Sequence, residues 1–270
     1  MPVLLRPDGA VQVGWDPRRA VLVRPPRGLT AGGLAALLRS MQSRVSLTEL
    51  QRQAVDLGLV DARDLADLIA QLVGAGVATQ GRPQRTGRSP SIQVHGRGPL
   101  SDLLTEGLRC SGARIRRSSQ PHATTPGRTD LVVLSDYLVA DPRMLRDLHS
   151  DGVPHLPVRV RDGVGLVGPL VIPGMTSCLR CADLHRRDRD AAWPAVAAQL
   201  RDTVGAADPA TLMATAALAL SQVNRVIGAV RGMDTADPSP PAALNATLEF
   251  DLNAGSIVAR HWSRHPLCFC

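Results

Sequence analysis

The segment Pro173-Gly174-Met175-Thr176-Ser177-Cys178-Leu179-Arg180-Cys181 places two cysteines, with two residues between them, directly after a glycine turn. A second close pair, Cys268-Phe269-Cys270, stands at the C-terminal end of the sequence. Tetrahedral zinc takes four soft ligands at about 2.3 Å, and a short spacer lets one turn aim two sulfurs at one point. The two pairs therefore predict one structural zinc ion bound by Cys178, Cys181, Cys268 and Cys270.

The first pair has an alternative interpretation as a redox-active C-x-x-C motif. That motif requires a thioredoxin-like helix N-terminus and makes no use of a second pair, so zinc is favoured. Five cysteines in a reducing compartment are more typical of metal binding than of disulfides. Cys110 follows an apolar helical run, Leu103 to Leu108, and is predicted to be an ordinary buried thiol.

Length and composition exclude several classes of protein. A chain of 270 residues can bury a sizeable core, and we expect two domains. No charged segment followed by an apolar run opens the sequence, and no stretch reaches about 18 consecutive apolar residues. We therefore expect a cytoplasmic protein without a membrane segment. The net charge is +7 without a single lysine, which we interpret as a genomic bias toward arginine. Aromatic residues at 2% argue against base stacking, so we expect no nucleic-acid partner.

Residues 1–80 are predicted to form a small α+β domain of the winged-helix type. Three short β-type runs within residues 2–24 are followed by three helical segments. The second helix opens with the capping box Ser46-Leu47-Thr48-Glu49, and the third runs from Asp61 to Gly74. Residues 81–90, rich in glycine, proline and arginine, are the predicted linker to a second domain. The second helix is expected to bury one apolar face, made of Leu47, Leu50, Ala54 and Leu57.

A DNA-binding regulator and a peptide-binding module are the two interpretations of this first domain. From Arg44 to Ala78, three arginines stand against five acidic residues, which gives a net charge of −2. DNA binding demands positive charge, so this composition disfavours a regulator. A sheet of three short strands leaves an edge unpaired, and such an edge can accept a peptide as an added strand. Peptide binding is therefore the favoured interpretation.

Residues 91–270 begin like a dinucleotide-binding domain. A short apolar strand, Ser91 to Val94, leads into the turn Gly96-Arg97-Gly98-Pro99-Leu100-Ser101 and a helical run. Glycines in such a turn let backbone N–H groups approach phosphate at the helix N-terminus, which makes Gly96 and Gly98 candidate nucleotide-binding residues. Further strands are predicted at Arg114 to Arg116, at Asp130 to Asp136, at Leu156 to Val160 and in a hairpin within Gly163 to Val171.

Three motifs together resemble the ThiF/MoeB (E1-like) superfamily. They are the segment Gly168 to Cys181, the charged segment Asp183 to Asp190, and Trp262-x-x-His265-Pro-x-Cys268-x-Cys270. The branch they resemble most is that of the E1-like partner proteins of peptide-modifying cyclodehydratases, which often carry an N-terminal peptide-recognition domain. The resemblance covers residues 91–270. It implies a Rossmann-like α/β domain with a mostly parallel sheet, helices on both faces, a structural zinc and a homodimer.

Active members of this superfamily adenylate a carboxylate with ATP and magnesium. The resemblance implies that Asp136, after the third strand, corresponds to their metal-binding aspartate beside Gly96 and Gly98. Their phosphate-contacting lysine has no counterpart, because the chain contains no lysine and arginine does not replace a compact ammonium group. The segment before Asp130 is too short for their other nucleotide contacts, and its candidate remnants are Arg116, Arg117, Gln120 and Arg128.

The resemblance therefore implies a degenerate E1-like protein that is not itself catalytic. We expect it to bind a precursor (leader) peptide and to act with a separate catalytic subunit in peptide modification. The alternative is an ATP-dependent ThiF-family adenylyltransferase that activates a carboxylate, for which ATP and magnesium are required.

Polar residues near the cysteines allow two interpretations. His185, Asp188 and Asp190 are either a metal or acid–base cluster or, as we favour, the solvated start of a helix whose dipole attracts acids. His261 and His265 precede the last cysteine pair and offer ligand or supporting roles. Because four cysteines suffice for zinc, neither histidine is predicted to be a ligand.

Overall fold

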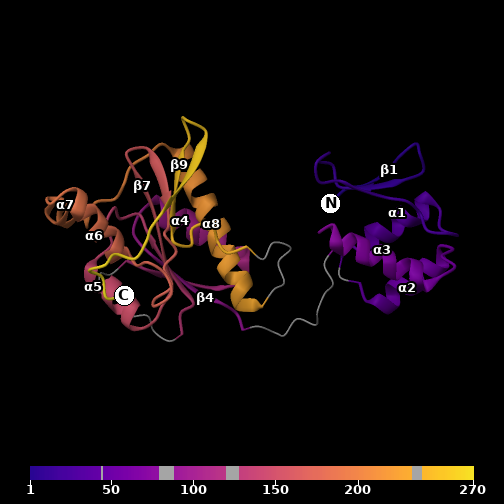
Figure 1. Cartoon of the computed structure of the whole chain (residues 1–270), viewed down its shortest axis with the longest axis horizontal. Coiled ribbons are helices and arrows are strands. Elements are labelled where there is room, and N and C mark those ends of the chain that lie inside the picture. The colour runs from indigo at the N-terminus through magenta and orange to yellow at the C-terminus, as the bar shows by residue number, and fades with distance from the viewer. Residues whose placement is uncertain (44, 79–87, 120–127, 233–238) are drawn as a thin grey trace. The chain divides into compact units, whose positions relative to one another are not determined.

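The chain divides into two units, Met1–Gln84 and Arg85–Cys270, in a computed structural model that describes residues 1–43, 45–78, 88–119, 128–232 and 239–270 (Figure 1). Each unit contains its own cluster of buried apolar side chains. Of the predicted linker, residues 81–90, only 88–90 lie within the described residues.

The N-terminal unit consists of a three-stranded antiparallel sheet, in the order β1-β2-β3, and three helices. Side chains cap the helices where the sequence predicts them to begin: Ser46 Oγ accepts the N–H of Glu49 at 3.1 Å, and Asp61 accepts the N–H of Arg63 at 2.8 Å. The elements are β1 (Val3–Leu5), β2 (Val11–Val13), β3 (Val21–Val23), α1 (Ala31–Ser40), α2 (Leu47–Asp56) and α3 (Ala62–Gly74).

The apolar face of α2 is shorter than predicted. Leu50 and Ala54 are buried in the core of the unit, but Leu47 is 58% exposed and Leu57 is 37% exposed. The reason is that Leu47 is the first residue of the helix and Leu57 is its C-cap, so both lie beyond the part of α2 that packs on its neighbours.

The C-terminal unit is built on a seven-stranded sheet with the order β10-β9-β8-β7-β6-β4-β5. Its strands are β4 (Ser91–His95), β5 (Arg114–Ser118), β6 (Leu131–Ser135), β7 (His155–Arg161), β8 (Val164–Val167), β9 (Ala246–Asp251) and β10 (Ser256–His261). Its helices are α4 (Pro99–Leu108), the short 3₁₀ helix η1 (Arg109–Ser111), α5 (Pro142–Ser150), α6 (Leu179–Arg189), α7 (Trp193–Leu200) and α8 (Pro209–Arg231).

The sheet is mixed, so the expectation of a mostly parallel sheet is corrected. Strands β5, β4, β6 and β7 run parallel, whereas β7-β8, β8-β9 and β9-β10 pair antiparallel. The change of direction occurs at Asp162-Gly163, where both residues have positive φ, 50° and 79°. Two such residues form the tight turn that suits a β-hairpin, whereas a parallel connection needs a longer crossover. The hairpin joins β7 to β8, which corrects the expectation of a hairpin within Gly163 to Val171.

Helices cover both faces of this sheet, as predicted (Figure 1). On one face, Val94 and Val133 pack in a core with Leu104 of α4 and Val223 of α8. On the other face, Val132 packs with side chains from α5 and from the start of α6. Cys110 lies in η1 and is exposed, which corrects its prediction as a buried thiol: the chain leaves the buried face of α4 at Leu108.

Helix α8 is, among the described residues, the one helix long and apolar enough to cross a membrane. In the fold, its residues Ala216, Ala219, Val223 and Ile227 belong to the core between the sheet and α4. Its apolar stripe is thus accounted for by packing inside the C-terminal unit.

Candidate functional site

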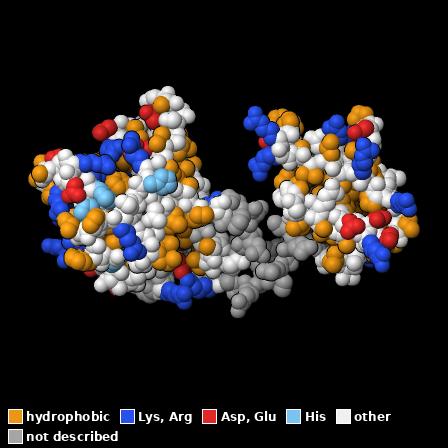
Figure 2. All heavy atoms as spheres, in the orientation of Figure 1, with side chains coloured by type: hydrophobic (Ala, Val, Ile, Leu, Met, Phe, Trp, Pro, Cys, Tyr) orange, Lys and Arg blue, Asp and Glu red, His pale blue; other side chains and the backbone are white. Residues whose placement is uncertain are grey.

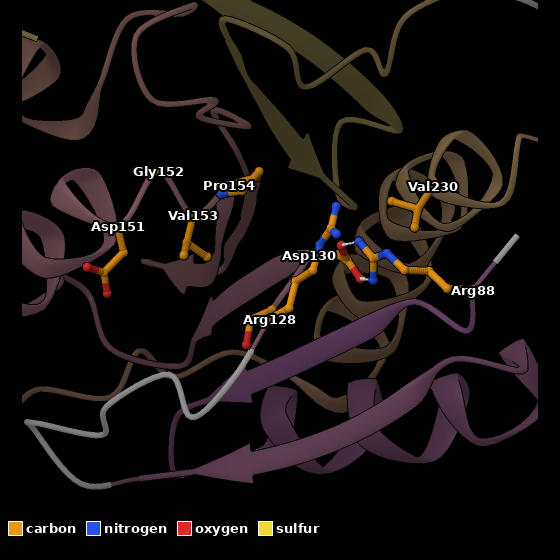
Figure 3. A pocket seen from close by; sticks show the side chains of 9 residues that line it. Arg88, Arg128, Asp130, Asp151, Gly152, Val153, Pro154 and Val230 are labelled. Carbon is orange, nitrogen blue, oxygen red and sulfur yellow. Dashed lines mark hydrogen bonds and ion pairs between the residues drawn. The ribbon is translucent and has the colours of Figure 1, made fainter.

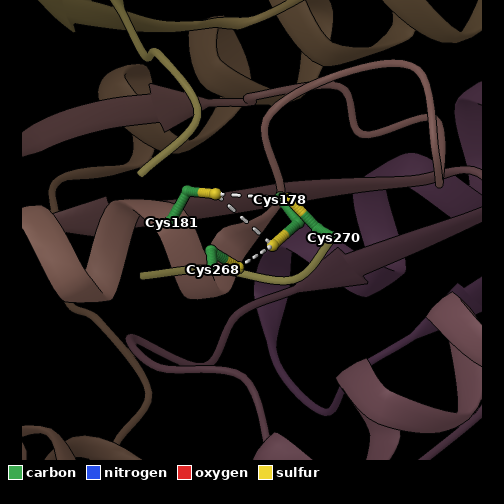
Figure 4. Close-up of side chains that lie close together, drawn as sticks. All are labelled: Cys178, Cys181, Cys268 and Cys270. Atoms are coloured by element: carbon green, nitrogen blue, oxygen red, sulfur yellow. Dashed lines mark hydrogen bonds between the residues drawn. The ribbon is translucent and has the colours of Figure 1, made fainter. Parts of the chain in front are cut away.

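Four cysteine side chains from two distant parts of the chain meet at one point (Figure 4). Cys178 is the N-cap residue of α6, Cys181 lies in the first turn of that helix, and Cys268 and Cys270 follow β10. The four sulfurs lie within 4.8 Å of one another. The Sγ–Sγ distances are 3.8 Å for Cys178–Cys181, 3.6 Å for Cys178–Cys268 and 3.4 Å for Cys181–Cys270. The structure therefore brings together all four predicted ligands.

These distances are compatible with a structural zinc ion. Four sulfurs at about 2.3 Å from a tetrahedral centre lie about 3.8 Å from one another. All four cysteines are free thiols, and Cys178 and Cys181 are buried. The donor set and its spacing fit zinc, and no other group of three or more potential ligands is close enough to hold a metal within the described part of the chain.

The electrostatics of the cluster favour a bound cation. Burial raises the pKa of the Cys178 and Cys268 thiols. Burial also opposes ionisation of Cys181, but hydrogen bonds from the backbone of His265 and Cys178, and from the Cys270 and Cys268 side chains, bring its pKa down to about 7. Metal ligation uses thiolates, and the N-terminus of α6 favours negative charge. A divalent cation would offset half of the negative charge of four thiolates and would thereby favour loss of their protons.

His265 holds the segment that carries the last two cysteines. Its side chain is 5% exposed, and Nε2 lies 2.7 Å from a carboxylate oxygen of Asp188. Nδ1 accepts the N–H of Leu267 at 3.1 Å, and the carbonyl of His265 accepts the N–H of Cys268 at 2.9 Å. The hydrogen bond to His265 is the main cause of a lowered pKa at Asp188. His265 thus orients the segment that carries Cys268 and Cys270, and it is not itself a member of the four-cysteine cluster.

The charged residues after the first cysteine pair lie at the end of α6, so their interpretation as a helix start is wrong. Helix α6 already begins at Leu179, because Cys178 is its N-cap, and Asp190 is its C-cap residue. His185 Nε2 lies 3.2 Å from the carbonyl of Ser263. With the Asp188 contact, this links α6 to the C-terminal segment. His261 lies exposed in β10.

Two further contacts around the cysteines were not predicted from the sequence. The N–H of Ser177 donates to Asn245 Oδ1 at 2.9 Å, and the guanidinium carbon of Arg186 lies 5.1 Å from the ring centroids of both Trp193 and Trp262. Asn245 has a φ of 55°, a conformation that asparagine tolerates better than most residues. In the sequence, an asparagine immediately before a β-type run was the feature that could have indicated this turn.

The glycine turn closes around Asp136. A Cβ atom at Gly96 would lie 2.4 Å from the carbonyl oxygen of Ser135 and 2.9 Å from the Asp136 carboxylate. A Cβ atom at Gly98 would lie 2.7 Å from Asp136 Oδ1. The structure thus places the three predicted nucleotide-site residues together. Glycine is required at both positions because the chain's own carboxylate approaches the turn.

The Asp136 carboxylate occupies the N-terminus of α4. Pro99, the first residue of that helix, has no N–H. Leu100 donates its N–H to Asp136 Oδ1 at 2.9 Å, and Ser101 donates its N–H to Oδ2 at 3.2 Å. Asp136 is 1% exposed, and burial raises its pKa although the hydrogen bonds from Ser101 and Leu100 oppose the rise. Both first-turn donors that would face a phosphate are therefore already bonded.

The predicted remnants of other nucleotide contacts have different partners. Arg117 forms an ion pair with Asp102 at 2.6 Å, and Arg116 donates to Ser91 Oγ at 3.1 Å. Gln120 lies outside the described residues.

Arg128 lies at the opposite end of the strands from the glycine turn, just before β6. There it lines a pocket of about 680 Å³ with Arg88, which forms an ion pair with Asp130 (Figure 3). Thr129 contributes a buried hydroxyl without a partner among the described residues. Arg128 is thus not part of the glycine-turn site.

The chain was compared with protein families, curated proteins and solved structures, and only solved structures are similar to it. No protein-family model matches the chain, and no curated protein matches it significantly. Among solved structures, a heterocyclase in complex with substrate and cofactor has a TM-score of 0.67 at 16% identity, covering 97% of this chain and 37% of that one. The heterocyclase TruD has a TM-score of 0.66 at 17% identity, covering 99% of this chain and 41% of that one. E. coli MccB with ATP has a TM-score of 0.60 at 13% identity, covering 99% of this chain and 96% of that one.

The chain has the E1-like fold of TruD and MccB. This confirms the resemblance drawn from the cysteine and C-terminal motifs. The chain spans less than half the length of the two heterocyclases, 37% and 41%, but nearly all of MccB, 96%. At these identities the likeness establishes the fold of the chain, while its substrate and activity have to be argued from its own residues.

Proposed function

We propose that this E1-like chain binds a precursor peptide through its leader, as the partner of a separate catalytic subunit, and does not itself activate a carboxylate. The E1-like fold supports a place in peptide modification, since it is shared with heterocyclases, one of them solved with substrate and cofactor. A solved structure of MccB contains AMPCPP together with MccA. The proposal transfers peptide binding to this chain but not adenylation.

The observation that carries the second half of the proposal is the position of Asp136. Its carboxylate accepts the N–H groups of Leu100 and Ser101. The turn lies so close to this carboxylate that a Cβ atom at Gly96 or Gly98 would be 2.9 or 2.7 Å from it. A triphosphate at this turn would have to displace a buried anion from the helix N-terminus. The absence of lysine removes a further phosphate contact, because the remaining cation type is a broad, planar guanidinium.

The N-terminal unit supports the peptide-binding half of the proposal. With the order β1-β2-β3, both outer strands have one edge without a partner in their own sheet. An extended peptide can add to such an edge through backbone hydrogen bonds. Leu65, Leu68 and Leu72 of α3 are buried in the core that the helices share with the sheet, and the helix that packs against β1 and β2 is α1. We propose a winged-helix-like recognition domain on this basis.

The surface charge of this unit is in keeping with a peptide partner. On the face shown in Figure 2, acidic side chains are interspersed with arginines over the N-terminal unit. Arg52 of α2 pairs with Glu49 at 2.6 Å and with Asp56 at 3.2 Å, so its charge is balanced within the helix. Duplex DNA requires a basic surface that neutralises several phosphates.

The remaining parts of the proposal concern assembly. We propose that the four-cysteine centre holds a structural zinc, that the protein is cytoplasmic and that it forms a homodimer. The zinc would fasten the segment after β10 to the start of α6, and the His265–Asp188 contact supports the same junction.

ATP-dependent chemistry is tested directly by pyrophosphate exchange with the full chain, magnesium and candidate acyl acceptors. The proposal predicts no exchange above background and no saturable heat when AMPCPP is titrated calorimetrically. Robust exchange that is lost in Asp136→Ala would establish the alternative, an ATP-dependent adenylyltransferase. The observation in support of that alternative is the match to MccB, which was solved with ATP, over nearly the whole of both chains.

A further inference from the structure

A pocket of about 680 Å³ lies at the amino ends of β4, β6 and β7, at the opposite end of these strands from the glycine turn and Asp136 (Figure 3). Its wall comes from the residues that precede β4 and β6, from the connection between α5 and β7, and from Val230 in the last turn of α8. All of these residues belong to the C-terminal unit. Pockets of about 300–1,000 Å³ hold small molecules, so its size suits a ligand.

One end of the pocket carries an uncompensated positive charge. Asp130 is occupied on both carboxylate oxygens, because Arg88 forms a two-point ion pair with it and the N–H of Ser91 donates to it at 2.8 Å. Arg128 is exposed and has no hydrogen-bond or ion-pair partner within the described ranges. Two arginines thus stand against one acid at this end, and the guanidinium of Arg128 is free to pair with an anion from outside the chain.

Thr129 lies next to this charge. The residue lines the pocket and is 8% exposed, and its hydroxyl has no hydrogen-bond partner among the residues that the structure describes. An unpaired buried hydroxyl costs free energy, and a carboxylate bound at Arg128 would offer the acceptor that it lacks. Because the oxygen is shielded from solvent, this contact requires a rotation of the Thr129 side chain about its Cα–Cβ bond.

The other end of the pocket is negative. Asp151 is the C-cap residue of α5, and its exposed carboxylate has no hydrogen-bond or ion-pair partner in the described part of the chain. The carbonyl groups at the C-terminus of a helix also favour positive charge. Val153 and Pro154 lie between Asp151 and Arg128 and make an apolar wall (Figure 3). The pocket therefore offers one place for an ammonium group and another for a carboxylate, with apolar side chains between them.

We propose that this pocket binds a short peptide with free termini, with its carboxylate paired with Arg128 and its ammonium group with Asp151. The charges of the lining residues, those of Arg88, Arg128, Asp130 and Asp151, sum to zero, which matches a zwitterion. The apolar wall between the two free charges favours a peptide over a single amino acid, whose two charged groups sit on the same carbon. Each further residue lengthens an extended peptide by about 3.3–3.6 Å.

Two other ligands match the pocket less well. Inorganic phosphate carries up to two negative charges, whereas Arg128 is the arginine of this wall that has no partner among the described residues. An internal segment of a longer peptide has neither terminal charge, so this ligand is distinct from the leader segment of the proposed function.

The site is tested by NMR titration of the isotope-labelled full chain with trialanine, and with its N-acetylated and C-amidated forms as controls. At constant ionic strength, trialanine should shift the backbone amides of Asp151 and Gly152 saturably. Loss of either terminal charge should weaken binding about threefold to tenfold, as should Arg128→Gln or Asp151→Asn. Arg146→Gln and Asp147→Asn change exposed charges of α5 outside the pocket, and both variants should bind trialanine as the wild type does.

The assignment of each charge is tested by combining the variants with the blocked peptides. Arg128→Gln removes the same contact as C-amidation, so it should not weaken binding of the amidated peptide further. Asp151→Asn should likewise leave binding of the acetylated peptide unchanged, while each variant should weaken binding of the other blocked form. A general folding defect would affect both blocked peptides alike.

The comparison of free with blocked trialanine needs no variant, so it remains decisive if a variant fails to fold. Equal binding of trialanine and its doubly blocked form, no saturation, or alanine binding as tightly as trialanine would overturn the proposal. Saturable binding of inorganic phosphate but not of trialanine would also overturn it. Leader binding is observed at the outer strands of the N-terminal unit, so each proposal can fail without the other.

Discussion

The Asp136 carboxylate accepts the backbone N–H of Leu100 at 2.9 Å, across a separation of 36 residues in the sequence. This contact joins the end of β6 to the start of α4 and places a negative charge where a dinucleotide fold offers its helix N-terminus to phosphate. The same carboxylate that the resemblance assigns to a metal ion is here a cap of the chain's own helix.

Removing this cap should destabilise the C-terminal unit. Asp136→Ala leaves the N–H groups of Leu100 and Ser101 without their acceptor, and we expect a loss of about 1–3 kcal/mol in the free energy of unfolding. Asp136→Asn keeps one acceptor oxygen but turns its NH2 group toward the other N–H, while it removes a buried charge, so its loss should be smaller than that of Asp136→Ala. Urea unfolding at pH 7 measures both. Asp102→Asn, an exposed acid in the first turn of α4, is the control; equal losses for the alanine and asparagine variants would contradict the account.

The four-cysteine centre should bind about one zinc per chain. Cys178→Ser or Cys268→Ser should lose the metal and strongly destabilise the C-terminal unit, because structural zinc supplies about 10–16 kcal/mol of apparent binding energy in small domains. Metal analysis of the purified protein and thermal unfolding measure the two effects. Cys110→Ser is the matched control, since Cys110 is exposed and outside the cluster. Native protein with well under half an equivalent of zinc would be incompatible with a structural site.

Acid should destabilise the protein through His155. Burial lowers the pKa of His155 to about 4, and its ring contacts the carbonyl of Val153. Below about pH 6.5 the unfolded chain binds a proton that the folded chain excludes, so stability is full above that pH and falls as the pH drops toward 4. The loss contributed by His155 should reach about 3 kcal/mol. His155→Gln should flatten the pH dependence of urea unfolding between pH 6.5 and 4, and the exposed His261→Gln should not; the same slope in all three proteins would refute this role.

The features that the sequence predicted well depend on short-range patterns. The cysteine pairs and the caps at Ser46 and Asp61 each involve neighbours in the chain, where spacing limits geometry. The strands and helices of the C-terminal unit follow the apolar runs for the same reason.

The features that it missed depend on contacts between distant segments. The parallel and antiparallel halves of the sheet cannot be told apart from apolar runs alone, because both kinds of strand are buried. The role of Asp136 requires a φ of 73° and the approach of β6 to α4, which no local pattern specifies. The exposure of Cys110 likewise follows from where the chain leaves α4. The prediction extended the apolar face of that helix past Leu108, where the helix ends.

The central claim, that the N-terminal unit binds a leader peptide by adding it to its sheet, is tested by NMR titration of the isotope-labelled full chain. Candidate leader peptides encoded beside its gene are added, with a scrambled peptide of the same composition as the control. The account predicts saturable shifts of backbone amides along one outer strand, β1 or β3, and along the adjoining helix, and none with the scrambled peptide. No shifts at millimolar peptide, or shifts confined to the helical surface away from the sheet, would contradict it.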